Sequence, residues 1–151
     1  MALQRKFHTI PPTYFFSSIL AIIILYFAMP AYLVIPFWYN LLGILPIAAG
    51  IWLNKSAKDA FVRHKTPHDY NQPVSIVNTG IFCRTRNPMY IGMFMALAGL
   101  AVLFGNLWGL FVPVVFMAII CIYFVPLEER AMRQIFGEEF ELYCRQVRRW
   151  I

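Results

Sequence analysis

The sequence contains few charged residues, and two long stretches contain none. Only 13% of its 151 residues are Asp, Glu, Lys or Arg, whereas 60% are hydrophobic and 17% aromatic. Soluble domains have about 25% charged and about 45–50% apolar residues. A chain of this composition cannot cover its surface with polar groups. The composition therefore predicts an integral membrane protein, and the length of the chain predicts a single domain over residues 1–151.

Motifs that would indicate other classes of protein are also missing. The eight glycines form no GxG, which excludes a Rossmann cofactor site, and the sequence has no P-loop, GxSxG or HExxH motif. The three cysteines, Cys83, Cys121 and Cys144, include no CxxC pair. We therefore expect no metal site and no redox motif.

The two uncharged stretches are long enough for two membrane-spanning helices each. Residues 9–54 and 87–127 contain no Asp, Glu, Lys, Arg or His, and one span needs about 20 apolar residues. Prolines 30 and 36 bracket a turn in the first stretch, and Gly105-Asn106 marks a turn in the second. We expect an all-α fold with four transmembrane helices in two hairpins, at about 13–29, 37–53, 88–104 and 107–127.

All 13 Lys and Arg residues lie before the first expected span, between the second and third, or after the fourth. By the positive-inside rule, both termini and the middle loop face the cytoplasm. Basic residues at the inner leaflet interact with anionic membrane lipids, so the net charge of +6 requires no nucleic-acid partner. No targeting signal is evident, which favours a bacterial or archaeal inner membrane.

Helical periodicity continues beyond the spans. Residues 55–64 extend the second span, 66–80 form an ordered surface loop, and 132–147 form a C-terminal amphipathic helix that Gly137 bends. In the third span, Gly92, Ala96 and Gly99 share a face that permits close helix packing. Small-residue faces of this kind leave a dimer open, although nothing else in the sequence indicates one.

The candidate site lies where the third span begins and the fourth ends. Glu128 and Glu129 stand at the membrane surface, where a charged pair is costly without a cationic partner. A helix that begins at Pro88 presents unpaired N–H groups to a polar or anionic ligand group. A zwitterionic, positively charged ligand suits both features, and S-adenosylmethionine is such a molecule.

Several segments, in order, resemble the superfamily of isoprenylcysteine carboxyl methyltransferases and phospholipid N-methyltransferases. They are Gly80–Gly92 (GIFCRTRNPMYIG), Glu128-Glu129, Phe136-Gly137, Tyr143 and Val147–Trp150. The resemblance implies an integral membrane methyltransferase that uses S-adenosylmethionine near the cytosolic surface. It places the cofactor-binding half at about residues 66–151.

The resemblance also implies a role for each matching residue. Those on the adenosine side are Val74, Ser75, Ile76, Val77 and Phe82. Those that hold the cofactor at the start of the third span are Asn87, Pro88, Met89 and Tyr90. Glu128 meets the amino group of the cofactor, Glu129 supports or acts on the acceptor, and Arg149 closes the site and orients the substrate.

Two departures bear on the acceptor. Prenylcysteine methyltransferases usually have Arg-His-Pro where this chain has Asn87 before Pro88, and a substrate-binding arginine where it has Phe124. These departures argue against the prenylcysteine carboxylate as the substrate but leave the general reaction in place. The expected acceptor is a lipophilic or membrane-associated carboxylate or amine. A small thiol or amine remains an alternative acceptor. A non-enzymatic membrane scaffold, with the glutamates merely paired to nearby arginines, remains an alternative function.

Overall fold

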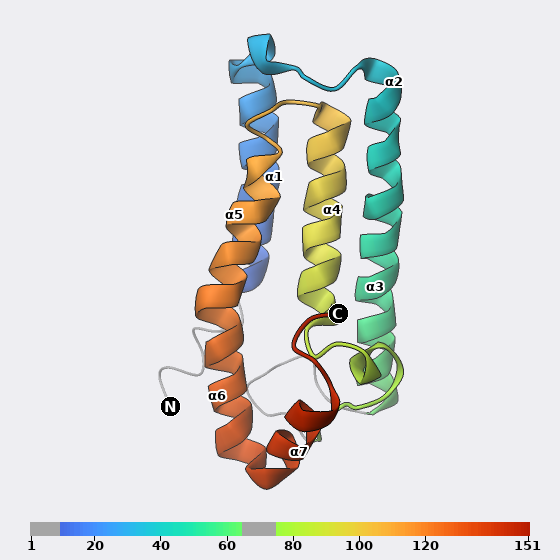
Figure 1. The fold of residues 1–151 in the computed structure, drawn as a ribbon, viewed down its shortest axis with the longest axis vertical. Helices are drawn as coiled ribbons and strands as arrows, with labels where there is room; N and C mark the ends of the chain where they lie inside the picture. The colour runs from blue at the N-terminus through green and yellow to red at the C-terminus, as the bar shows by residue number, and fades with distance from the viewer. Residues whose placement is uncertain (1–9, 65–74) are drawn as a thin grey trace.

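The chain folds into an all-α bundle, which confirms the all-α part of the predicted fold class. The structure is a computed structural model that describes residues 10–64 and 75–151. Figure 1 shows long helices running side by side. The long elements are α1 (Ile10–Ala28), α3 (Ile44–Arg63), α4 (Pro88–Phe104), α5 (Phe111–Ile119), α6 (Val125–Phe136) and α7 (Glu138–Gln146). The short ones are η2 (Pro30–Tyr32), α2 (Phe37–Asn40), η3 (Leu41–Gly43), η4 (Gly80–Cys83) and the π-helical η5 (Ile120–Phe124).

The helices follow the predicted spans closely, with one clear error. The third predicted span coincides with α4. The range predicted for the second span is divided among α2, η3 and α3, and α3 continues to Arg63, as expected for residues 55–64. The fourth helix was predicted to begin at residue 107 but begins at Phe111. It then runs through η5 and α6 to Phe136, beyond the predicted end at residue 127. Within the described residues, two helical stretches, Pro11–Ala28 and Phe111–Phe136, are long and apolar enough to cross a membrane.

The late start of the fourth helix has a local cause at Asn106. This fully buried side chain accepts hydrogen bonds from the backbone N–H groups of Trp108 and Gly109 (3.0 and 3.3 Å). Its Nδ2 donates to the carbonyls of Leu25 and Met29 at the end of α1 (3.3 and 2.8 Å). Asn106 thus holds residues 107–110 in a turn and ties the two hairpins together at this end of the bundle.

Helices α3 and α4 pack backbone against backbone through facing glycines. A Cβ added at Gly50 would overlap the carbonyl of Gly92, and one added at Gly43 would overlap the carbonyl of Gly99. The small-residue face predicted on the third span therefore serves contact within the chain. Close packing of this kind is the usual use of such faces in membrane helices.

Pro126 lies just after the π-helical turn η5 within the long fourth helix. Proline has no N–H group, and its ring clashes with the carbonyl four residues earlier in a regular α-helix. The wider π turn at Ile120–Phe124 accommodates it, and π turns of this kind often occur near functional sites. The helix continues as α6, which carries Glu128 and Glu129 in its first half.

The chain reverses at Gly137, where φ is +54°, so that α7 folds back toward the start of α4. This is the bend predicted from the sequence. Phe140 and Tyr143 on α7, together with Val147 just after it, form a buried cluster with Ile76. Figure 1 shows the C-terminus at the base of α4, between α3 and α6. The last residues therefore return to the predicted site.

Candidate functional site

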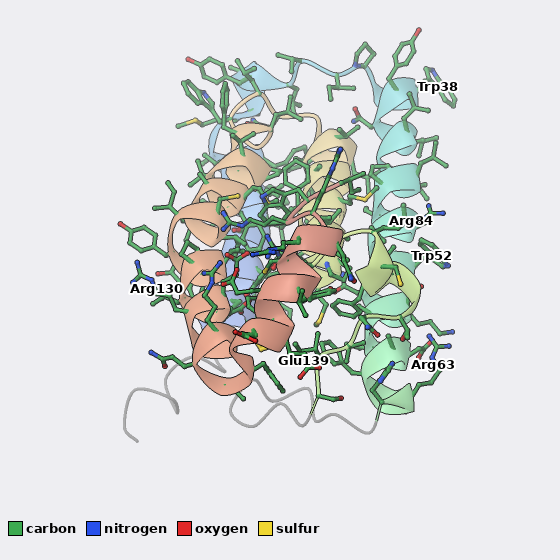
Figure 2. The ribbon with its side chains drawn as sticks, turned by 60° about the horizontal axis from the view of Figure 1, so that its bottom comes forward. Trp38, Trp52, Arg63, Arg84, Arg130 and Glu139 are labelled. Carbon is green, nitrogen blue, oxygen red and sulfur yellow. The ribbon has the colours of Figure 1, made fainter. Side chains whose placement is uncertain are left out.

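The predicted site residues gather at the end of the bundle where α4 begins and α6 extends beyond the other helices. We call this the charged end, defined by Arg86, Glu129, Arg133 and Arg149. Figure 2 brings this end toward the viewer, with Arg63 and Arg130 pointing outward from the bundle. The charged residues that define the end are joined by the ion pairs described below.

Tyr90 and Glu128 join the beginning of α4 to α6. Tyr90 lies in the first turn of α4, which Pro88 opens, and is 5% exposed. Its hydroxyl donates a hydrogen bond to Glu128 Oε1 at 2.5 Å. The two side chains are 38 residues apart in the sequence, so only the antiparallel packing of the helices brings them together. Among the described residues, Glu128 has no cationic partner.

Glu129 is a buried carboxylate surrounded by three arginines. Arg149 makes a bidentate contact with Glu129, with Nε 2.9 Å from Oε1 and Nη2 2.6 Å from Oε2. Arg86 Nη2 lies 3.3 Å from Oε1, and Arg133 Nη1 lies 3.9 Å from Oε2. The hydrogen bond to Glu129 raises the pKa of Arg149, which therefore stays charged. A buried carboxylate needs such compensation, because its removal from water costs several kcal/mol.

The segment before α4 also holds the C-terminal tail through its backbone. Thr85 Oγ1 and Asn87 Nδ2 each donate to the carbonyl of Arg149 at 3.1 Å. The backbone N–H of Arg86 donates to the carbonyl of Arg148 at 3.0 Å. Trp150 packs against the apolar cluster that includes Tyr90. These hydrogen bonds and this packing therefore hold the C-terminal tail against the charged end.

The residues expected on the adenosine side belong to two apolar clusters next to the C-terminal tail. Val77 and Phe82 pack with Ala57 and Ala60 of α3, with Met89 against them. Ile76 belongs instead to the cluster on α7. Ser75 opens the described part of this loop, and Val74 lies outside the described residues.

Tyr143 connects the two clusters. Its hydroxyl donates to the carbonyl of Phe82 at 2.8 Å. Burial raises the pKa of Tyr143, an effect that the nearby Arg86 only partly opposes, so the hydroxyl remains a donor. The hydrogen bond fixes α7 against η4.

Sequence reasoning did not assign site roles to Thr85, Arg86, Arg133 or Cys144. Arg86 Nη1 donates to Cys144 Sγ, and Arg86 Nε is buried without a hydrogen-bond partner in the described part of the chain. Arg133 also pairs with Glu141 at 2.6 Å. The dense run Arg84-Thr85-Arg86 was a visible signal, but the sequence did not show which arginines would face inward.

The chemistry of these groups fits S-adenosylmethionine. Glu128 offers a carboxylate to a cationic group, and the unpartnered Arg86 Nε offers a buried donor to an anionic one. The apolar surfaces at Val77 and Phe82 suit a flat ring. Cationic, anionic and aromatic parts of one ligand would thus each meet a matching group.

Comparison with known families supports this assignment. Residues 38–139 match the model of the family described as phospholipid methyltransferase, a region that contains Tyr90, Glu128 and Glu129 but neither α1 nor the tail. Curated proteins and solved structures give no significant match. The family match and the apolar helices together make this a membrane protein. The matched region exceeds half of the chain, so the chain belongs to the phospholipid methyltransferase family, within the wider group of membrane methyltransferases that also includes the isoprenylcysteine enzymes, and it is an S-adenosylmethionine-dependent methyltransferase.

Proposed function

We propose that the protein methylates the amine of a phospholipid headgroup at the charged end. The observation that carries this proposal is the contact between Tyr90 and Glu128, because it brings the start of α4 and the first half of α6 together around a carboxylate. That carboxylate has no cationic partner among the described residues, so it is available to a cationic ligand. The family description points to a phospholipid as the acceptor.

The proposed topology places this site at the cytosolic surface. Four spans, with both termini and the middle loop in the cytosol, would put all 13 Lys and Arg residues on one side. The single domain of residues 1–151 would then have its apolar turns on the far side and its charged end at the inner leaflet. The arrangement of α3, α4 and the fourth helix in Figure 1 is consistent with two antiparallel hairpins.

We assign the apolar loop residues to binding the adenosine of the cofactor. We assign the residues at the start of α4 to binding the rest of the cofactor. The residues assigned here are Val74, Ser75, Ile76, Val77, Phe82, Asn87, Pro88, Met89, Tyr90 and Glu128. Glu128 meets the amino group, and Tyr90 fixes the orientation of that carboxylate through its hydrogen bond. The bound cofactor would supply a methyl group on a positively charged sulfur. The neutral amine of the acceptor would form the new N–C bond in line as the S–C bond breaks and S-adenosylhomocysteine leaves, so alignment would provide most of the catalysis.

On the acceptor side, we assign Arg149 to bind the phosphate of the phospholipid. Two of its nitrogens engage Glu129, while the side chain remains 42% exposed and can present further N–H groups. Guanidinium groups suit phosphate because their donors form a planar fork. Glu129 then acts by holding Arg149 in place, and the acceptor amine is presented toward the Tyr90–Glu128 pair.

The first test is binding of S-adenosylhomocysteine to the protein in detergent, measured by calorimetry. We expect Glu128→Gln and Tyr90→Ala to weaken binding at least about tenfold, because charge-assisted hydrogen bonds contribute about 1.5–3 kcal/mol. Glu139→Gln is the matched control, since Glu139 is an exposed glutamate on α7. Equal affinity in all four proteins would remove Glu128 and Tyr90 from the cofactor site.

The second test follows a labelled methyl group in a membrane extract supplied with the protein. Base-stable label in the lipid fraction is the expected result, because an N-methyl bond resists hydrolysis. Base-labile label would indicate an ester and hence a carboxylate acceptor. Volatile label would indicate a small thiol, and either of these results would overturn the proposed acceptor.

A further inference from the structure

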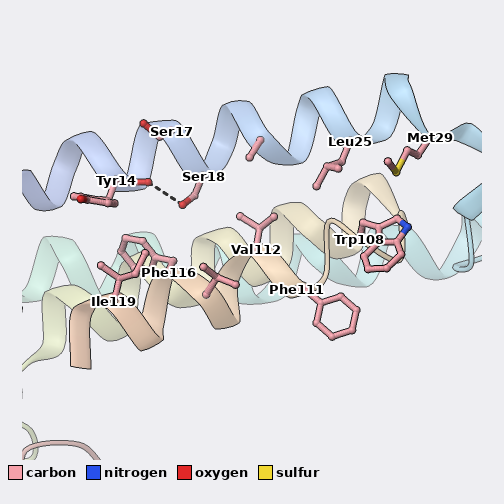
Figure 3. Close-up of a pocket in the computed structure, with 12 residues that line it drawn as sticks. Tyr14, Ser17, Ser18, Leu25, Met29, Trp108, Phe111, Val112, Phe116 and Ile119 are labelled. Carbon is pink, nitrogen blue, oxygen red and sulfur yellow. Dashed lines mark hydrogen bonds between the residues drawn. The ribbon is translucent and has the colours of Figure 1, made fainter. Parts of the chain in front are cut away.

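A groove separate from the charged end runs between α1 and α5. Its volume is about 580 Å³, and Figure 3 shows α1 along one side and α5 along the other. Its lining is almost entirely apolar, and the exceptions are mainly at one end, where Tyr14, Ser17 and Ser18 lie. Val115 on its rim is 57% exposed, so the groove opens to the surroundings of the bundle.

The groove exists because small side chains on α1 face large ones on α5. Ser18 and Ala21 lie on the same face of α1 at helical spacing, and Ser18 donates its hydroxyl to the carbonyl of Tyr14 at 2.8 Å. Opposite them, Val112 and Phe116 do not fill the space. Two apolar helix faces that would normally pack together therefore leave a hollow between them.

One end of the groove reaches the proposed site. The ring of Tyr14 packs edge-on against Phe124, with 5.6 Å between ring centroids. Phe124 belongs to the same buried cluster as Tyr90 and Phe116. It also lies four residues before Glu128, and residues at this spacing share a helix face. Tyr14, at this end of the groove, thus contacts a residue about one helical turn before Glu128.

The dimensions of the groove suit a single hydrocarbon chain. From Tyr14 to Met29 the groove follows fifteen residues of α1, about 22 Å at 1.5 Å per residue. That length exceeds half of a bilayer core that is about 30 Å thick. A helix of the same length and about 10 Å in diameter would need roughly 1,700 Å³, far more than the groove provides. A helix from a second protein could therefore not be enclosed in the groove, whereas a single acyl chain is narrow enough to be.

We infer that the groove holds one acyl chain of the phospholipid acceptor, with the headgroup at the Tyr14 end. This inference rests on the proposed function, because that function supplies a lipid whose headgroup amine must reach the methyl group of the cofactor beside the Tyr90–Glu128 pair. The hydroxyl-bearing residues lie at the end where the ester linkages of the lipid would be, and the purely apolar part follows the chain into the bilayer.

Photo-crosslinking tests the location without any turnover. The probe is phosphatidylethanolamine with a diazirine in the middle of one acyl chain, and labelled peptides are identified by mass spectrometry. We expect label to concentrate on residues 14–29 and 108–119, and Ala21→Phe to reduce it at least about fivefold by filling the hollow. Ala28→Phe is the control, because Ala28 is exposed on the same helix and does not line the groove. Label spread evenly over α3 and the other outer helix faces would mean ordinary surrounding lipid and would overturn the inference.

Kinetics with two acceptors test whether the groove serves the reaction. For long-chain phosphatidylethanolamine, Ala21→Phe should raise KM at least about tenfold, because several methylenes lose their apolar contacts. For the dihexanoyl lipid, kcat/KM should match that of the wild type. Equal KM values with the long-chain lipid would overturn the inference. If the wild type methylates neither lipid while groove labelling persists, the proposed acceptor fails and the acyl-chain site stands.

Discussion

The two ends of the bundle each bury a polar side chain, but they use it differently. At the uncharged end, Asn106 is fully buried and neutral, and all its hydrogen bonds go to backbone groups of α1 and the adjacent turn. At the charged end, Glu129 is 6% exposed, and the partners of its carboxylate are three arginine side chains from separate segments. A neutral amide that satisfies backbone groups is a structural device. A carboxylate that gathers guanidinium groups leaves further donors available to a ligand.

Among the substitutions that test this comparison, replacement of Glu129 should have the largest effect on stability and methyl transfer. Glu129→Gln leaves the guanidinium groups of Arg86, Arg133 and Arg149 without their shared carboxylate. Loss of one partner of a buried ion pair costs about 3–5 kcal/mol, and we expect the lower figure because Arg133 and Arg149 are partly exposed. Methyl transfer should fall about 100-fold as Arg149 loses its position. Thermal melting in detergent and labelled methyl transfer measure the two effects.

Glu138→Gln is the control for this experiment, since Glu138 is exposed at the start of α7. If the Glu129→Gln variant has the same melting temperature and the same rate of methyl transfer as the control, the arginines are held by other contacts. The proposed distinction between the two ends would then be wrong.

Asn106→Ala should affect stability alone. The change leaves two backbone N–H groups and two carbonyls near α1 without their partner, at a cost of about 1–3 kcal/mol. The charged end lies at the opposite end of the bundle, so the folded fraction should keep its kcat and its KM for both substrates. A lower melting temperature with unchanged kinetic constants is the expected result. A change in KM would show that the two ends are coupled.

The contrast also explains what the sequence could reveal. Helix α4 was predicted from Pro88 to Phe104 because its limits are local: proline at the first position and Gly105 with φ of +64° just after the last. The bend at Gly137 was predicted for the same kind of reason. The start of the fourth helix was predicted too early because it depends on Asn106 bonding to carbonyls of α1, about 80 residues away. Periodicity carries no record of such distant contacts.

The candidate site could likewise be predicted only in part. Motif order indicated that Tyr90, Glu128, Glu129 and Arg149 belong together, and the structure brings them to one end. The sequence could not show that Arg86, among 13 basic residues, would face inward with an unpartnered Nε, since that depends on the packing of α7 and the tail. The groove between α1 and α5 was equally inaccessible, because it depends on the separation of two helix faces.

Arg149→Lys should produce a selective effect on the acceptor. Lysine keeps the charge but cannot form the two-pronged contact with Glu129. We expect KM for the phospholipid to rise about tenfold, in line with about 1.4 kcal/mol, while the affinity for S-adenosylhomocysteine stays unchanged. Arg148→Lys, one residue earlier and exposed, is the matched control. Equal losses of cofactor and acceptor affinity would place Arg149 on the cofactor side instead.

Tyr143→Phe should have the smallest effect and tests how the two apolar clusters are joined. It removes only the hydrogen bond to the carbonyl of Phe82, which contributes about 1 kcal/mol. Because Phe82 is assigned to the adenosine side, we expect a two- to threefold weaker affinity for S-adenosylhomocysteine, about 0.5 kcal/mol, and a slightly lower melting temperature. Tyr123→Phe, at an exposed tyrosine on the fourth helix, should change neither. If Tyr143→Phe lowers the melting temperature but leaves the affinity intact, α7 stabilises the charged end without shaping the adenosine surface.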